Sequence, residues 1–408
     1  MLSITEFIEK LKIENNQCQD MRNFVKCIPK VELHVHLNGC IREQTLIELA
    51  QERNVQLSHL LSEIHELQHE VPTINNKRRS LLECFEIFGE IAMCVTDLPA
   101  LRRITREALE DFANSDVAYV ELRSTPKVLN VDDRLPDGRK ATKLMYVDTI
   151  IEEMINFENK EKHRYDRNRI PLTPRFIVSI NRSESIDDAM EHAKLAVDYK
   201  IEGNRYVVGL ELSGDPHKNL FQNFEPAFKL AKDNGLCTSI HCGEIHCEQE
   251  NITSFPYEDT IRILDFTPDR LGHALLLSES MFQNLESRHI KIPIECCPTS
   301  NVMTLELAKH VEGDLVHGLR RHPRLSQWIS NEYPISISTD DPGIFNTDPI
   351  TELTLLVEAF QVNEPWPLIR IVLDSISHSF ESKEFKVLLL EAFQQKIKSI
   401  LQSESSNL

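Results

Sequence analysis

The sequence predicts an α/β fold: a (β/α)8 TIM barrel with extra helices between strands 1 and 2 covering the mouth. Eight short β-branched or apolar runs recur along the 408 residues. Amphipathic helical patterns lie between these runs, as is typical of a parallel sheet covered on both faces. Eight such units favour a closed barrel. An open doubly wound sheet is the alternative, but no GxGxxG fingerprint follows the first run.

The strands and helices are expected in alternation along the chain. The predicted strands are 30–36, 117–123, 175–180, 206–212, 237–242, 270–274, 292–297 and 334–339. The predicted helices are 80–95, 99–114, 143–158, 185–200, 222–234, 256–264, 278–288 and 314–330. Residues 37–115 are too many for one crossover, so we expect several helices above the barrel mouth. Residues 131–140 and 159–174 are predicted loops because they are charged and proline-punctuated.

We expect residues 1–408 to form a single barrel domain, with a helical extension over 1–28 and a frayed tail over 403–408. Apolar residues make up 41% and charged residues 27%, as in ordinary soluble proteins. No run approaches the length of a membrane span, and the start resembles an amphipathic helix more than a secretory signal. The ten cysteines are scattered, without a CxxC pair. This pattern favours free thiols and predicts a cytoplasmic location.

The charge of the chain narrows its possible partners. The formal net charge is −19 at pH 7, so nucleic acid polymers should be repelled. A small anionic ligand remains possible because a pocket sets its own local potential. We expect a monomer that binds a small molecule and no membrane.

Two histidines stand out in the first strand, in the run VELHVHLNG. His34 and His36 are two residues apart, so their side chains leave the same face of the strand. They point into the barrel if the alternate aliphatic residues pack outward against helices. Two inward imidazoles at one strand end can hold a cation, although a pair of hydrogen-bonded core histidines is the simpler alternative.

Further metal-ligand types fall at the ends of later strands. His241 ends the fifth strand, His273 lies in the sixth, and the pair Asp340 and Asp341 follows the eighth. Catalytic groups of barrels gather at the carboxyl ends of strands, and a buried pair of acids is costly unless it is paired or metal-bound. Together these residues favour a metal site. Histidine and carboxylate ligands without thiolate suit zinc, and iron, cobalt or manganese remain alternatives.

Glu244 follows His241 by three residues, in HCGEI. Gly243 allows the chain to bend so that the carboxyl group can return toward the site. Glu244 could then be a metal ligand or a general acid–base group. The alternative is a solvated loop glutamate.

Seven motifs occur in order over residues 30–346: VELHVHLNG, ELRSTPK, LSGDP, HCGEI, RLGHA, IECCPTSN and STDDPGIF. Together they resemble the adenosine deaminase family, within the metal-dependent amidohydrolase superfamily. HLNG and STPK are most similar to the adenosine deaminase-like branch that acts on N6-methyl-AMP. The Cys-rich signature of the other zinc deaminases is absent.

The resemblance implies one zinc ion (Zn2+) per chain, held by His34, His36, His241 and Asp340. His273 and Asp340 would orient and help to deprotonate the metal-bound water, and Glu244 would protonate purine N1. These roles agree with the chemistry, because zinc brings the pKa of bound water to about 7 and attack at C6 requires a proton at N1. Asp341 would contact N7 and the backbone at Gly214 would contact N3. The full implied set of substrate contacts is His36, Asn38, Ser124, Thr125, Pro126, Lys127, Asn181, Gly214, Glu244 and Asp341.

Asn38 bears on the choice between nucleotide and nucleoside. The nucleoside deaminases of the family carry Asp at this position, where it binds the 5′-hydroxyl. A carboxylate there would repel a 5′-phosphate by roughly 4 kcal/mol per unit charge at 4 Å and an effective dielectric of 20. Thr125 and Lys127 could supply a hydroxyl and an ammonium group to that phosphate. The alternatives are that Asn38 only turns the chain and that Lys127 is a solvated loop lysine.

Two positions depart from the nucleotide branch as we align it. Ala92 stands where that branch usually has a substrate-contacting histidine, and Asn181 where it often has aspartate. Neither position belongs to the predicted metal set. Both bear on contacts to the ribose or phosphate and on the preference for the N6-methyl group.

The predicted function is zinc-dependent hydrolytic deamination of 6-aminopurine nucleotides, converting N6-methyl-AMP and other N6-alkyl AMPs to IMP and an alkylamine. Three alternatives stay open at this stage. An adenosine deaminase would convert adenosine to inosine and ammonia, and Asn38 argues against it. A catalytically silent purine-binding relative would be favoured by loss of a ligand or of Glu244. Another amidohydrolase would be favoured by two metals and a carboxylated lysine.

Overall fold

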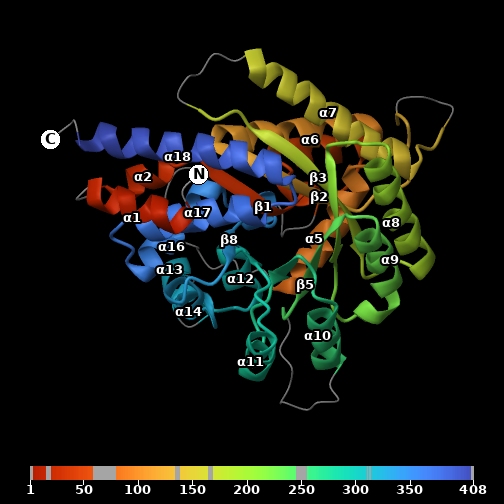
Figure 1. The fold of residues 1–408 in the computed structure, drawn as a ribbon. Helices are drawn as coiled ribbons and strands as arrows, with labels where there is room; N and C mark the ends of the chain where they lie inside the picture. The colour runs from red at the N-terminus through yellow and green to blue at the C-terminus, as the bar shows by residue number, and fades with distance from the viewer. Residues whose placement is uncertain are drawn as a thin grey trace.

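The structure, a computed structural model, describes residues 3–14, 20–57, 80–133, 138–163, 169–244, 255–309, 311 and 314–405. Eight parallel strands form one sheet in the order of the sequence, which confirms the predicted barrel (Figure 1). The strands are β1 Lys30–His36, β2 Val117–Ser124, β3 Thr173–Asn181, β4 Val207–Ser213, β5 Cys237–Cys242, β6 Arg270–His273, β7 Ile294–Cys296 and β8 Ile335–Ile337. Each lies within a few residues of its predicted range.

The barrel closes between β1 and the segment that follows β8. Val35 forms a parallel bridge with Asp340. The N–H of His36 donates to the carbonyl of Asp340 at 2.9 Å, and the N–H of Asp340 donates to the carbonyl of His34 at 3.0 Å. The closure therefore brings Asp340 beside the two histidines of β1.

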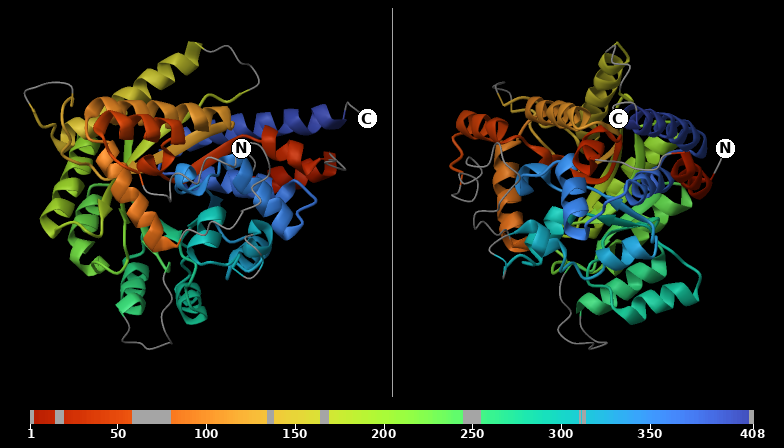
Figure 2. Two further views of the ribbon diagram at one scale, coloured as in Figure 1. Left: turned by 180° about the vertical axis from the view of Figure 1, so that it is seen from behind. Right: turned by 90° about the vertical axis from the view of Figure 1, so that its left-hand side faces the viewer.

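Helices surround the sheet and pack the outer faces of its strands (Figures 1 and 2). Before β2 they are α1 Ile4–Glu14, α2 Met21–Cys27, the 3-10 turn η1 Leu37–Cys40, α3 Glu43–Arg53, α5 Leu81–Cys94 and α6 Leu98–Asn114. Between later strands they are α7 Lys143–His163, α8 Ile186–Ile201, α9 Phe221–Asp233, α10 Phe255–Phe266, α11 Glu279–Ser287, α12 Pro298–Thr304, α13 Leu315–Leu319 and α14 Leu325–Ser330. After β8 come α15 Pro342–Phe345, α16 Pro349–Phe360, α17 Trp366–His378 and α18 Lys383–Ser405.

Several predicted bounds were wrong. The helix predicted over 314–330 is two short helices, α13 and α14, because Pro323 between them has no N–H to donate and cannot continue a helix. α7 takes the first five residues of the loop predicted at 159–174, and α18 takes the first three of the tail predicted at 403–408. The remaining positions 406–408 lie outside the described residues, as do 134–137 and 164–168 in the two predicted loops. The helices after β8 were not predicted.

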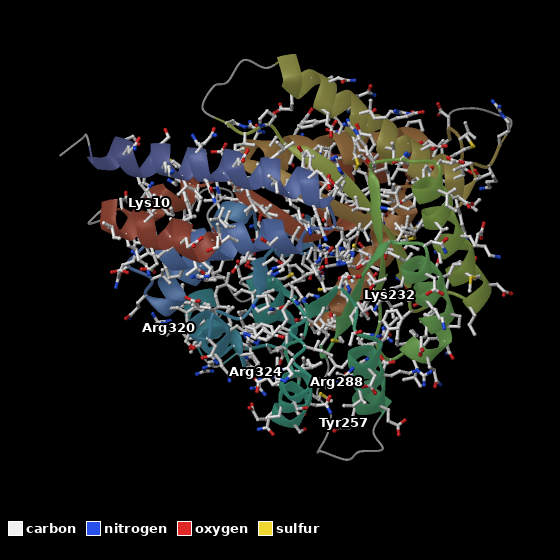
Figure 3. All side chains as sticks on the ribbon, in the orientation of Figure 1. Lys10, Lys232, Tyr257, Arg288, Arg320 and Arg324 are labelled. Atoms are coloured by element: carbon white, nitrogen blue, oxygen red, sulfur yellow. The ribbon has the colours of Figure 1, made fainter. Side chains whose placement is uncertain are left out.

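The strands alternate as a barrel requires. In β1 the side chains of Val31, Leu33 and Val35 are buried in the hydrophobic core, whereas His34 and His36 face the barrel interior. Charged side chains on the outside of the barrel form ion pairs at the surface. Arg288 pairs with Asp265, and Arg324 pairs with Glu279 (Figure 3). None of the described helices is long and apolar enough to cross a membrane.

Candidate active site and metal centre

Three histidines and one aspartate meet at the carboxyl end of the barrel. Nε2 of His36 lies 3.2 Å from Nε2 of His241. Oδ1 of Asp340 lies 3.3 Å from Nε2 of His34 and 3.4 Å from Nε2 of His36. Ligands about 2.0–2.1 Å from a tetrahedral zinc lie roughly 3.3 Å from one another. The ligand atoms of His34, His241, His273 and Asp340 all lie within 4.8 Å of one another, and those of His36, Glu211 and His241 form a second such group. The predicted ligand His36 thus adjoins the first group through His241 and Asp340.

The other ring nitrogens of these histidines face carboxylates. Nδ1 of His34 is 2.6 Å from Oε2 of Glu295, and Nδ1 of His241 is 3.4 Å from Oε2 of Glu211. Glu211 also lies 3.9 Å from Nδ1 of His36. A carboxylate behind a histidine keeps the proton on Nδ1 and frees Nε2 to bind a metal. Nε2 of His34 is buried and lies 3.3 Å from Oδ1 of Asp340, so a metal ion could be bound between these two atoms.

The pKa shifts differ between the histidines of the site. Burial and Arg123 act to lower the pKa of His34, but its hydrogen bonds to Asp340 and Glu295 raise it overall. Burial lowers the pKa of His36 to about 4, although Glu211 and Asp340 act in the opposite direction. Burial and the neighbouring histidines hold the pKa of His241 well below its usual range. Burial alone would raise the pKa of Asp340, but its hydrogen bond to His34 and the histidines around it hold it well below its usual range. Neutral imidazoles and an ionised carboxylate are the forms that bind metals.

His273 lies beside this cluster and is held in place from behind. Its Nδ1 is 3.1 Å from Oδ1 of Asn301, so Nδ1–H donates and Nε2 faces the site. Ser300 donates to Oδ2 of Asp340 at 2.7 Å. His273 and Asp340 both have left-handed backbone conformations, with φ of 57° and 62°. Such conformations cost free energy in residues other than glycine and cluster at functional sites.

Glu244 returns toward the cluster as the sequence predicted. Gly243 has φ of 65°, and Oε1 of Glu244 lies 3.3 Å from Nε2 of His273. Burial raises the pKa of Glu244, while His273 acts in the opposite direction. A carboxyl group with a raised pKa can carry a proton near neutral pH, which suits a general acid.

Gly39 follows Asn38 for a steric reason. A Cβ atom at Gly39 would collide with the side chain of Asp341. Burial and the adjacent Asp340 raise the pKa of Asp341 well above its usual range. Its Oδ1 is buried without a hydrogen-bond partner among the described residues, so the carboxyl group can serve a ligand.

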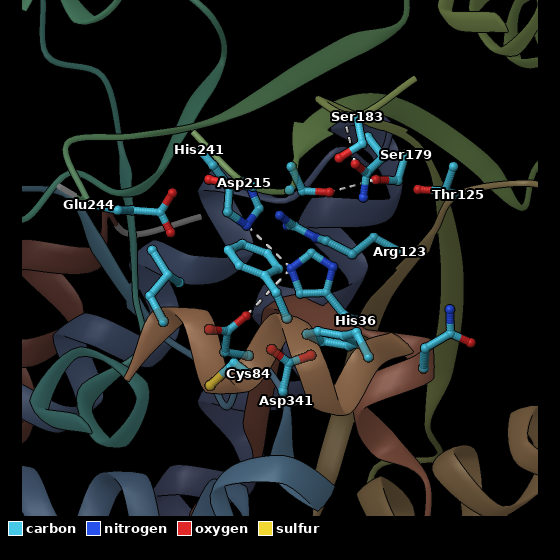
Figure 4. Close-up of a pocket in the computed structure, with 18 of the residues that line it drawn as sticks. His36, Cys84, Arg123, Thr125, Ser179, Ser183, Asp215, His241, Glu244 and Asp341 are labelled. Carbon is cyan, nitrogen blue, oxygen red and sulfur yellow. Dashed lines mark hydrogen bonds and ion pairs between the residues drawn. The ribbon is translucent and has the colours of Figure 1, made fainter. Parts of the chain in front are cut away.

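A cavity of about 730 Å³ opens above the cluster, between the strand ends and α5. Figure 4 shows the rings of His36 and His241 facing each other, with Glu244 beside them. The predicted residues that line the cavity are His36, Asn38, Ser124, Thr125, Lys127, Asn181, Gly214, His241, Glu244, His273, Asp340 and Asp341. His34 lies beneath the floor with no exposed surface, and Pro126 is not part of the lining.

The two departures from the nucleotide branch lie in different surroundings. Ala92 is exposed and does not line the cavity, so its side chain is not positioned to contact a ligand there. Asn181 does line the cavity, and its Oδ1 accepts from the N–H of Ser183 at 2.8 Å. Gly214 has φ of 93°, and a Cβ there would lie 2.6 Å from Oδ1 of Asn181. Glycine at 214 therefore leaves room for Asn181.

The rim near β1 and β2 carries the predicted phosphate contacts. The hydroxyls of Ser124 and Tyr146 are 2.7 Å apart, and Asn38 also hydrogen-bonds Tyr146. Lys127 is exposed at the mouth of the cavity. The surrounding protein atoms desolvate its ammonium group and lower its pKa, while Glu184 acts in the opposite direction. These groups can donate hydrogen bonds to an anion at this edge of the cavity.

The sequence analysis missed the residues behind the site. Arg123, Glu211 and Glu295 are fully buried inside the barrel. Burial alone would raise the pKa of Glu295, but Arg123, Arg270 and the hydrogen bond from His34 hold it well below its usual range. The sequence did contain a signal for these residues. Charged residues interrupt otherwise apolar strands at inward positions in VELRS, GLEL and IEC. The analysis also missed the apolar wall that α5 contributes with Leu81, Cys84, Phe85 and Phe88.

Comparison with known proteins assigns the class. The profile of the adenosine deaminase family matches residues 29–396, and the chain belongs to this family. An N6-mAMP deaminase of Arabidopsis thaliana is 32% identical over 88% of this chain and 96% of that protein. The predicted family and the purine deaminase class of hydrolase are confirmed. The family is metal-dependent, and His34, His241, His273 and Asp340 form a cluster that could hold a metal ion.

Solved structures agree with this assignment. A crystal structure of Arabidopsis ADAL with IMP is 30% identical, has a TM-score of 0.71, and is matched over 94% of this chain and 99% of that chain. A crystal structure of Arabidopsis ADAL with GMP is also 30% identical with a TM-score of 0.71, over 93% and 98% of the two chains. Purine nucleotides thus bind these relatives.

Proposed function

We propose that this protein hydrolyses N6-methyl-AMP to IMP and methylamine, and that it uses one zinc ion per chain. The observation that carries the proposal is the set of four ligand atoms of His34, His36, His241 and Asp340 beneath a cavity that Glu244 also lines. In this reaction water replaces the N6 amine at C6, and the leaving amine takes up a proton.

A zinc ion held by these residues would supply a hydroxide nucleophile at neutral pH, because zinc lowers the pKa of bound water to about 7. The side chains of the protein transfer protons and position the purine. Glu244 donates a proton to N1 as C6 becomes tetrahedral, and its raised pKa keeps that proton available. His273 and Asp340 orient the attacking water, and Asp341 donates to N7. Gly214 approaches N3 through its backbone.

The preference for a nucleotide rests on the rim. Asn38 offers donors without a charge, where a carboxylate would repel a phosphate. Lys127 and Thr125 also line the cavity at this rim, where they supply an ammonium group and a hydroxyl group. The complexes of related proteins with IMP and GMP support a nucleotide as the ligand.

Incubation with adenosine, AMP, N6-methyladenosine and N6-methyl-AMP tests this proposal, with products separated by chromatography. We expect IMP and methylamine in a one-to-one ratio from N6-methyl-AMP, and little product from either nucleoside. Inosine formed faster than IMP would favour the adenosine deaminase alternative. Absence of any product from metal-loaded protein would favour a silent purine-binding relative.

We infer that the active unit is a monomer with one barrel domain, because a single barrel brings together the residues to which the reaction is assigned. No disulfide joins the eight cysteines of the described residues, which supports the predicted cytoplasmic location. Light scattering of the purified protein and fractionation of cells test these two inferences.

A further inference from the structure

Buried ionic side chains continue from the metal cluster toward the opposite end of the barrel. Each of them is no more than 1% exposed, and they come from β2, β4, β6 and β7: Glu121, Arg123, Glu211, Arg270 and Glu295. Their formal charges alternate in sign along the chain of contacts. Ion pairs buried this completely are costly to assemble unless their geometry satisfies every group.

Glu295 is the member that contacts a metal ligand. Its Oε2 accepts from His34 Nδ1 at 2.6 Å and from Arg123 at 3.0 Å. Its Oε1 accepts from Arg270 Nε at 2.6 Å and from Ser239 at 2.9 Å. Four donors therefore fix the carboxylate, and this fixes the ring of His34 that it holds.

Arg270 is itself held from three sides. A second nitrogen of its guanidinium lies 2.5 Å from Oε2 of Glu121, and a third donates to the carbonyl of His378 at 2.9 Å. Its central carbon lies 3.5 Å from the centre of the Phe380 ring. The N–H of Phe380 donates to Oε1 of Glu121 at 2.6 Å.

The segment between α17 and α18 thus closes the lower end of the barrel against Arg270. A Cβ at Gly209 in β4 would lie 2.6 Å from the ring of Phe380, so glycine there makes room for that ring. A continuous line of hydrogen bonds joins Phe380, Glu121, Arg270, Glu295 and His34. The first of these residues lies at one end of the barrel and the last in the metal cluster.

We propose that Arg270 is a positioning residue for the metal centre, which sets metal affinity by holding Glu295 against His34. Arg270 does not line the cavity and contacts neither the ligand atoms nor the space for a substrate. It acts through the carboxylate, and partners of this kind typically contribute 10- to 100-fold to metal affinity. This inference rests on the proposed metal-dependent function of the same site.

The test is the zinc dissociation constant of Arg270→Lys, measured on folded protein by competition with a chromophoric chelator. Lysine keeps the charge, but a point charge cannot bond Glu295, Glu121 and the His378 carbonyl together as the guanidinium does. We expect zinc binding to weaken about 10-fold or more. Added zinc should restore most of the turnover, because no group that touches the substrate has changed.

Arg175→Lys is the matched control. Arg175 is also buried at this end of the barrel, and its partners are Glu158 and Glu381. It should lose thermal stability without losing zinc affinity. If Arg270→Lys does not fold, Phe380→Leu removes only the ring beneath the guanidinium and should weaken zinc binding roughly 2- to 5-fold.

Equal zinc affinity in wild type and the Arg270→Lys variant would overturn the inference, as would an equal loss in Arg175→Lys. In the fallback experiment, unchanged affinity in Phe380→Leu would overturn it. A wild type that binds no zinc in the same titration would instead overturn the proposed function. The two failures are therefore distinguishable.

Discussion

The floor and the rim of the cavity are built differently. On the floor, His34, His241 and Asp340 lie on strands or directly after them, are buried, and are backed by carboxylates or hydroxyls. On the rim, Lys127 and Lys218 follow strand ends and are exposed. The floor therefore has the rigidity that metal chemistry requires, whereas the rim can change its partners at little cost to the fold.

This contrast predicts the largest losses for changes in the floor. His34→Ala, His241→Ala and Asp340→Ala should each remove most of the bound metal and abolish turnover, because an incomplete ligand set binds weakly. Metal analysis and turnover of each variant provide the measurement. His192→Ala is the control, since His192 is also fully buried but lies on α8. Full metal content with normal turnover in all three ligand variants would disprove the assigned site.

Glu244 lies between the floor and the rim, and its substitution should lower turnover more than substrate binding. Glu244→Gln keeps the size of the side chain but cannot donate an acidic proton. We expect normal zinc content, near-normal KM and a fall in kcat of about 10²–10⁴-fold. Steady-state kinetics at saturating zinc give both constants. Turnover close to that of wild type would exclude the proton-donor role.

The sequence predicted the floor better than the rim for a physical reason. Period-two alternation and strand ends place His34, His36 and Asp340 on the inner face of one end of the barrel. The alternation does not show which partner a buried charge finds, so the contacts of Arg123 and Glu295 were not predicted. Nor does it show left-handed backbone at His273 and Asp340, which tertiary contacts impose. The cavity wall of α5 depends on how a helix packs across a long connection.

At the rim, Asn38→Asp should discriminate between substrates. The new carboxylate would lie near the phosphate, and the repulsion after screening is on the order of 1–3 kcal/mol, or roughly 5- to 150-fold. The loss should appear in kcat/KM for N6-methyl-AMP, should be absent for N6-methyladenosine, and should shrink as salt is added. Equal losses for nucleotide and nucleoside would show that Asn38 acts only as a turn residue.

Lys127→Ala should give the smallest of these effects, because Lys127 is exposed and solvent screens its attraction for a phosphate. We expect a loss of about 1.5- to 5-fold in kcat/KM for N6-methyl-AMP alone, since exposed ionic contacts contribute roughly 0.2–1 kcal/mol. Lys140→Ala is the control: it makes the same change in net charge, but Lys140 contacts Asn130 and does not line the cavity.

The pH profile gives a second test of the role of Lys127. The pKa of Lys127 is lowered, so its charge and the nucleotide preference should disappear as pH rises, at a lower pH than for an ordinary lysine. Because kcat/KM reports the free enzyme, this loss should appear in wild type and be absent from Lys127→Ala. A nucleotide preference that both lysine variants reduce equally would mean that the overall charge of the protein, and not a contact at the rim, attracts the substrate.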